Sequence, residues 1–108
     1  MTEEEKFKSY PAYWQAIMSY KKKKVLGKTK GLSYGGLIFE SPMFMNVGDK
    51  CKIRIQGYHG SVKIDIQLEA EVSYWALTKG GHFDIGAKYL AMTERGKRNL
   101  RHYIQDRG

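Results

Sequence analysis

The chain has 108 residues, of which 42% are hydrophobic, and a net charge of +8, so it is long enough for one globular domain of ordinary composition. No apolar run comes near the roughly 18 residues that a membrane-spanning helix needs, and the start of the chain is acidic where a secretory signal is basic. A single cysteine, Cys51, excludes an internal disulfide and is typical of a reducing compartment. We therefore expect a cytoplasmic protein without membrane insertion.

The first twenty residues divide at Pro11, which lacks a backbone donor and disfavours helix at the residue before it. We expect residues 1–11 to be a flexible N-terminal segment and residues 12–108 to form a single domain. Residues 12–20 fit a strand or a helix, because their aromatic residues and isoleucine favour a strand whereas alanine, methionine and glutamine suit a helix. We expect a strand here, followed by a solvated turn at Lys21–Lys24.

Residues 25–40 hold two apolar runs around a glycine-rich middle. Four of the twelve glycines lie here, at Gly27, Gly31, Gly35 and Gly36. Glycine weakens a strand unless the backbone bends or another group approaches closely, so the pattern predicts one strand that enters a tight bend and another that leaves it. Ser33 lies in that bend, where its hydroxyl can bond the backbone or a ligand.

Alternation of apolar and polar residues identifies the later strands. Cys51 to Gln56 alternates, and so does Val62 to Tyr74 after a reversal at residues 57–61. At about 3.3 Å per residue the second of these is longer than a small domain is wide, so we expect it to coil around a barrel. Residues 83–89 alternate back, and residues 43–45 are expected to cap one end of the core.

The period changes to that of a helix at the C-terminus. Thr93 suits the N-cap and Glu94 the first turn of a helix at about residues 93–105. Apolar residues at helical spacing are Met92, Gly96, Leu100, Tyr103 and Ile104. The sequence therefore predicts a mainly β fold, a six-stranded antiparallel barrel with a C-terminal α-helix.

Catalytic chemistry has little support in the residue pattern. The three histidines have no spacing with Cys51 that makes a metal site, and Cys51 alternates with isoleucines as a buried apolar residue does. The acids of the long strand share a face that we expect to be solvated; they are Asp65, Glu69 and Glu71. We expect no enzyme, no metal and no cofactor.

The positive charge is concentrated at the two ends of the sequence. Residues 1–30 carry eight basic and three acidic side chains, and residues 91–108 carry five and two, while the sixty residues between them carry six of each. Ends that meet in space would form a positive face suited to an anion, although lysines also serve solubility. Single-stranded nucleic acid is a secondary alternative, because no basic stripe crosses the neutral middle.

The stretch Gly31–Gly36, Gly-Leu-Ser-Tyr-Gly-Gly, resembles the motif Asp/Asn-x-Ser-x-x-Gly of the PilZ domain family, bacterial receptors for cyclic di-GMP. Gly48-Asp49 resembles a turn of that family, residues 86–89 its last barrel strand and residues 100–104 its helix. The likeness spans about residues 12–104. It implies a PilZ-like barrel with a C-terminal helix and a role in bacterial signalling.

The resemblance also implies a ligand, cyclic di-GMP, which an upstream Arg-x-x-x-Arg pair grips in the family. Here the first arginine is Arg54, and Gly31 stands where the motif has an acid or amide. Lysine does not replace a bidentate guanidinium equally, so the resemblance implies a degenerate member. The nucleotide-contacting residues that it implies are Lys6, Lys8, Gly31, Ser33, Gly35 and Gly36.

Two functions of different classes remain open. We favour a protein adaptor in motility, pilus or biofilm signalling with weak or absent nucleotide binding; the alternative is a cyclic di-GMP receptor that uses lysines and the Ser33–Gly36 turn. Aromatic residues anchor protein interfaces, so we expect Tyr13, Trp14 and Tyr34 to contact a bacterial protein partner. Tyr10 and Tyr20 are further exposed aromatics on this expectation.

Overall fold

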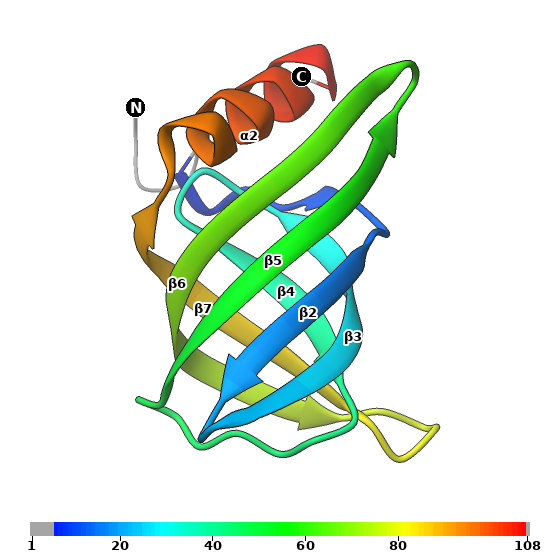
Figure 1. Ribbon diagram of the computed structural model, residues 1–108. Coiled ribbons are helices and arrows are strands. Elements are labelled where there is room, and N and C mark those ends of the chain that lie inside the picture. Colours follow the sequence, from blue (N-terminus) through cyan, green and yellow to red (C-terminus); the bar gives the residue numbers. More distant parts are fainter. Residues whose placement is uncertain (1–5, 108) are drawn as a thin grey trace.

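A computed structural model describes residues 6–107 and shows a closed β-barrel with a helix across one end (Figure 1). In the described residues, antiparallel strands follow the order β3-β2-β5-β6-β7-β4, and pairing of β3 with β4 closes this ring of six. The expected six-stranded barrel with a C-terminal helix is confirmed. The element bounds are β1 Tyr10–Pro11, β2 Gln15–Tyr20, β3 Lys23–Leu32, β4 Gly36–Ser41, β5 Lys50–His59, β6 Val62–Leu77, β7 Phe83–Met92 and α2 Glu94–Arg107.

Residues 15–20 are a strand, β2, which pairs with β3 on one side and β5 on the other. Lys21 and Lys22 form the tight turn into β3, and both have positive φ angles, 48° and 64°. The short β1 pairs with β3 near the glycine-rich bend. The flexibility expected for residues 1–11 stays a prediction, and residues 1–5 lie outside the described residues.

Strands β5 and β6 bury one face in the barrel core, as their alternation predicts, but Val62 and Tyr74, at the two ends of the alternating stretch, are exposed. β6 runs to Leu77, beyond the expected end at Tyr74. Its register with β7 shifts after Glu69 and again after Val72, and such irregularities let a long strand bend around a barrel. The reversal before β6 is tighter than expected, because β5 continues to His59 and the turn is made around Gly60.

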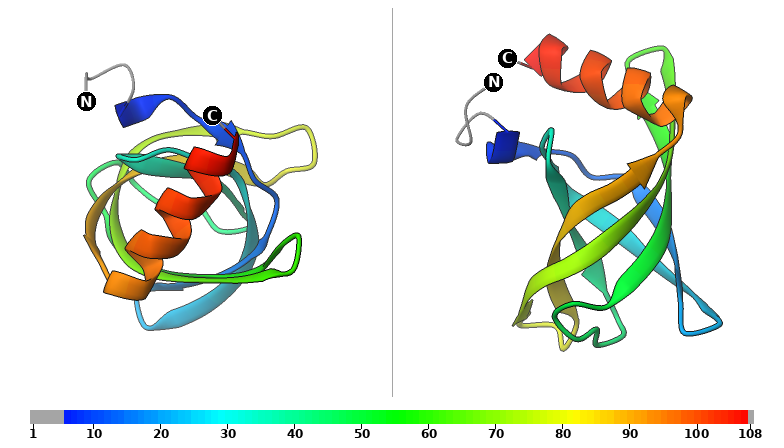
Figure 2. Two further views of the ribbon diagram at one scale, coloured as in Figure 1. Left: turned by 90° about the horizontal axis from the view of Figure 1, so that it is seen from above. Right: turned by 90° about the vertical axis from the view of Figure 1, so that its left-hand side faces the viewer.

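Helix α2 lies across one end of the barrel (Figure 2). Thr93 caps it, since the Gly96 N–H donates to the Thr93 hydroxyl over 3.1 Å and confirms the expected N-cap. Its apolar side, which includes Leu100, Tyr103 and Ile104, is buried. We call this end of the barrel, with α2 and the β3–β4 turn, the helix end.

The expectation that Asp65 faces solvent is wrong. The residue is only 5% exposed, because α2 packs against β6 at this position. Its carboxylate pairs with Arg54 over 3.1 Å, Arg95 lies 3.8 Å away, and its backbone N–H donates to the Asn99 side chain over 2.9 Å. The hydrogen bond from Arg54 lowers the pKa of Asp65, although burial acts in the opposite direction. Glu69 is half-buried.

The opposite end of the barrel is formed by three connections: the Lys21–Lys22 turn, residues 42–49 and the β6–β7 turn (Figure 1). Met45 is fully buried and fills this end of the core, as expected for residues 43–45, whereas Phe44 stays exposed. We call residues 21–23, 42–50 and 75–83 the loop end. In residues 6–107, no helix is long and apolar enough to cross a membrane.

Candidate functional site

The Ser33–Gly36 turn, which joins β3 to β4, is closed by its own serine. The buried Ser33 hydroxyl donates to the Gly36 carbonyl over 2.9 Å and accepts from the Gly36 N–H over 3.0 Å. A Cβ atom at Gly36 would lie 2.3 Å from the carbonyl oxygen of Ala87, so β7 approaches the turn too closely for a side chain. Tyr89, also on β7, donates its hydroxyl to the Ser33 carbonyl over 2.9 Å. The turn is therefore held from inside the protein.

The N-terminal segment packs directly against this turn. The Gly35 N–H donates to the Lys6 carbonyl over 2.8 Å. A Cβ atom at Gly31 would lie 2.3 Å from the Ser9 hydroxyl, so the glycine lets the segment approach β3. Four of the residues expected to contact a nucleotide are thus bonded to one another; they are Lys6, Ser33, Gly35 and Gly36.

The two expected lysines hold their ammonium groups over neighbouring rings. The Lys6 ammonium lies 5.5 Å from the centre of the Phe7 ring, and the Lys8 ammonium lies 5.4 Å from that of Tyr10. Cations over aromatic faces at such distances are weakly attracted at exposed sites. Both lysines are exposed and free to move toward an anion.

A hollow of about 240 Å³ lies beside the turn, on the outer face of β4, β6 and β7. Among the residues that line it, Lys88 is the one with an ionisable amino group, and that group already pairs with Glu71 over 3.3 Å. The remaining lining residues are Phe7, Ser9, Ser33, Gly36, Leu37, Ile38, Ser73, Tyr74, Gly86 and Ala87. This surface supplies little positive charge for a ligand with two phosphates.

A second hollow, of about 340 Å³, lies between the turn and α2. It is lined by Tyr34 and, from the helix, by Lys97 and Arg101, which stand one helical turn apart and therefore project from one side. Sequence reasoning did not single out these two cations. Their i, i+4 spacing was visible, but their position beside the turn depends on how α2 docks.

The aromatic residues expected to contact a partner differ in their solvent exposure. Tyr13 is 71% exposed. Trp14 is half-buried, because its indole N–H donates to the Tyr58 carbonyl over 3.0 Å and its ring packs edge-on against Tyr103, with the ring centres 4.7 Å apart. Trp14 therefore serves the packing of α2 as well as any external contact.

Tyr34 is half-buried against the core and lines the hollow beside α2. The expectation that Tyr20 is exposed is wrong: it is buried, because β2 turns its side chain inward, and its hydroxyl donates to Asp49. The hydrogen bond from Tyr20 lowers the pKa of Asp49 and ties the β2–β3 turn to the start of β5.

The barrel fold has a counterpart among solved structures. The Bacillus subtilis inhibitor of motility, MotI/DgrA, a PilZ-type protein, matches 92% of this chain with a TM-score of 0.76 and 13% sequence identity. The fold is PilZ-like. The match covers 49% of MotI/DgrA, so this chain spans about half the length of that protein. No protein-family model and no curated protein matches the sequence.

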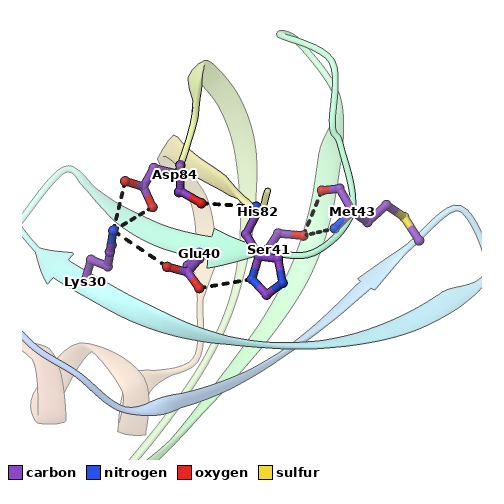
Figure 3. A network of polar contacts seen from close by, with 7 residues as sticks. Lys30, Glu40, Ser41, Met43, His82 and Asp84 are labelled. Atoms are coloured by element: carbon purple, nitrogen blue, oxygen red, sulfur yellow. Dashed lines mark hydrogen bonds and ion pairs between the residues drawn. The ribbon is translucent and has the colours of Figure 1, made fainter. Parts of the chain in front are cut away.

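Away from the turn, a group of ionisable side chains joins β3, β4 and the start of β7 (Figure 3). The Lys30 ammonium donates to both carboxylate oxygens of Asp84 over 2.9 Å and lies 3.7 Å from Glu40, which also meets His82 at 3.1 Å. The hydrogen bond to Asp84 raises the pKa of Lys30. Lys30, Glu40 and Asp84 thus each lie near an opposite charge, and the cluster ties three strands together.

Cys51 is buried, and His59 is engaged in a contact with a carboxylate. Burial raises the pKa of the Cys51 thiol to about 11, so it is not ionised at neutral pH. His59 meets Asp106 at 2.6 Å, and this contact lowers the pKa of Asp106. Within residues 6–107, no three histidine, cysteine, aspartate or glutamate side chains are placed to hold a metal ion.

Proposed function

We propose that this chain is a PilZ-like regulatory domain of bacterial motility or surface-attachment signalling, which acts by binding a protein and has little affinity for cyclic di-GMP. The fold shared with a motility inhibitor supports the regulatory class. Lys6 and Lys8, rather than arginines, lie near the place expected for the upstream Arg-x-x-x-Arg pair; this supports a degenerate nucleotide site, since guanidinium groups are the strong bidentate donors to phosphate.

The observation that carries the proposal is the closed Ser33–Gly36 turn. Its serine hydroxyl is bonded to Gly36, and the Gly35 N–H is bonded to the Lys6 carbonyl. A nucleotide at this turn would have to displace those bonds while gaining lysine contacts in place of bidentate arginine contacts. Each charge-assisted hydrogen bond that is lost costs about 1.5–3 kcal/mol, so losing several weakens binding by orders of magnitude.

Calorimetric titration with cyclic di-GMP, with GTP as the control ligand, tests the nucleotide part of the proposal. We expect no heat, or weak heat that is equal for GTP and disappears at moderate salt. Low-micromolar binding that is specific for cyclic di-GMP and survives moderate salt would contradict it. Affinity capture from the source bacterium then tests the adaptor part, which predicts a protein whose recovery does not depend on added cyclic di-GMP.

One observation favours the receptor as the second candidate. Lys97 and Arg101 line the hollow that Tyr34 also lines, next to the Ser33–Gly36 turn, so α2 offers cations where the upstream arginines are missing. A receptor of this kind predicts that Arg101→Ala abolishes the cyclic di-GMP heat. Arg98→Ala is the matched control, because Arg98 is exposed on the same helix and does not line the hollow. Equal loss from both variants would rule out a specific role for Arg101.

A further inference from the structure

The three connections of the loop end touch one another although they are far apart in sequence. Tyr20, at the end of β2, bonds Asp49 in the connection before β5. Phe44, in the same connection, packs edge-on against Trp75 and Phe83 of the β6–β7 hairpin, with ring centres 5.0 and 5.4 Å apart. The loop end is therefore one continuous surface, on the opposite side of the barrel from α2 (Figures 1 and 2).

This surface leaves large apolar side chains in water. Val47 is 62% exposed and Leu77 66%, and Phe44 and Trp75 are exposed as well. All five residues from Ser73 to Leu77 are exposed, and none of them is charged. Clustered apolar exposure of this kind marks an interaction site more often than chance exposure of single residues does.

The same end also carries positive charge. Five exposed lysines lie on it; they are Lys21, Lys22, Lys23, Lys50 and Lys79. In residues 6–107, none of the five forms an ion pair. Of the nearby carboxylates, Asp49 accepts from Tyr20 and attracts Lys21 without forming an ion pair with it, while Glu40 and Asp84 hold Lys30.

We propose that the loop end docks on an anionic lipid surface, with its lysines at the headgroups and the side chains of Phe44, Val47, Trp75 and Leu77 in the interface. The charge selects an anionic partner. More than half of the surface of Val47 and of Leu77 is exposed, so both side chains project from the loop end. Fluid acyl chains can pack around projecting side chains, whereas a folded protein partner would need pockets of matching shape. Tryptophan and lysine side chains are both suited to the interface between water and lipid.

Vesicle sedimentation tests this directly with the full chain. We expect binding to phosphatidylcholine vesicles that contain about 30% phosphatidylglycerol, little binding to phosphatidylcholine alone, and loss of binding as salt rises, since screening weakens surface attraction. Trp75 fluorescence in a Trp14→Phe background should shift to the blue on binding. No binding to anionic vesicles at low salt would overturn the proposal, and so would binding to soluble polyglutamate without binding to vesicles, which indicates an acidic protein segment as the partner.

Matched variants distinguish the contribution of the loop-end lysines to vesicle binding from that of the protein's overall positive charge. Lys21→Asn with Lys22→Asn removes two charges and keeps positive φ angles accessible, since asparagine tolerates them. We expect vesicle partitioning to fall about fivefold for each lysine. Lys63→Gln with Arg98→Gln removes the same charge at the helix end and should change partitioning less than about twofold, because charges beyond a Debye length are screened.

Two leucine variants test the contribution of apolar side chains to vesicle binding. Leu77→Ser at the loop end should lower partitioning into vesicles at least about fivefold. Moving a leucine side chain from water into an apolar environment is favourable, and serine lacks this gain. Leu90→Ser, an exposed leucine on β7 toward the helix end, should leave partitioning unchanged. Equal effects of the two leucine variants, or of the two charge variants, would contradict docking through the loop end.

Discussion

Helix α2 covers apolar side chains and a carboxylate at one end of the barrel, whereas the connections at the other end leave apolar side chains exposed. At the helix end, Leu100 and Ile104 are no more than 5% exposed, and the carboxylate of Asp65 is held by Arg54. At the loop end, Val47 and Leu77 are more than 60% exposed, and the lysines around them have no ion pair among the described residues. The helix end is therefore packed and paired, while the loop end leaves apolar side chains and lysines exposed, as the proposed docking surface requires.

The largest effect is expected at the helix end. Leu100→Ala removes a buried side chain between α2 and the barrel and should lower the free energy of unfolding by about 2–4 kcal/mol, measured by urea denaturation. Arg98→Ala, exposed on the same helix, should change it by less than about 0.5 kcal/mol. Similar values for the two variants would mean that α2 is not a structural cover.

The β3–β4 turn at the same end should be the next most sensitive. Gly36→Ala places a Cβ atom against the Ala87 carbonyl, and the backbone there cannot move without disturbing β7, so we expect a loss of about 1–3 kcal/mol. Gly80→Ala is the matched control, because its Cβ atom would meet nothing closer than 3.9 Å. An equal loss at Gly80 would show that the close approach at Gly36 is not the cause.

Lowering the pH should decrease the free energy of unfolding, because Asp65 at the helix end becomes protonated. The pKa of Asp65 in the folded protein lies below its ordinary value of 3.8, so the ionised carboxylate stabilises the fold at pH above about 5 and loses this effect as pH falls through 3.8 and below. Asp65→Asn should cost about 1–2 kcal/mol at neutral pH, less than a fully buried pair because Arg54 is half-exposed. Unfolding measured from pH 7 to pH 3 should show a smaller acid loss in the variant than in the wild type.

The smallest stability effect is expected at the loop end. Leu77→Ser removes a side chain that is already in water, so the free energy of unfolding should change by less than about 0.5 kcal/mol. A loss above about 2 kcal/mol would show that Leu77 belongs to the core, and the contrast between the two ends would fail.

Local periodicity predicted the later strands and the helix, whereas the strand at residues 15–20 was chosen over a helix from residue types. Strand β5 and α2 each carry an unbroken pattern, and the Thr93 cap is a signal within one turn. The predicted exposure of Asp65 and Tyr20 was wrong because the burial of each depends on a residue far away in sequence. Helix α2 covers Asp65, and Asp49 accepts a hydrogen bond from the Tyr20 hydroxyl.

The candidate sites were harder to predict for the same reason. Ser33 was identified from its turn, but its closure by Gly36 and by the Lys6 segment depends on tertiary packing. The loop end joins residues near positions 21, 47 and 77, and no local pattern relates them. Only closure of the barrel brings them to one surface (Figure 1).

Hydrogen–deuterium exchange of the full chain with and without anionic vesicles tests the contrast between the ends most directly. We predict added protection in residues 42–49 and 75–83 and none in residues 31–36 or in α2. Added protection confined to α2 or to the Ser33–Gly36 turn would contradict the account, because it would place the interaction surface at the helix end.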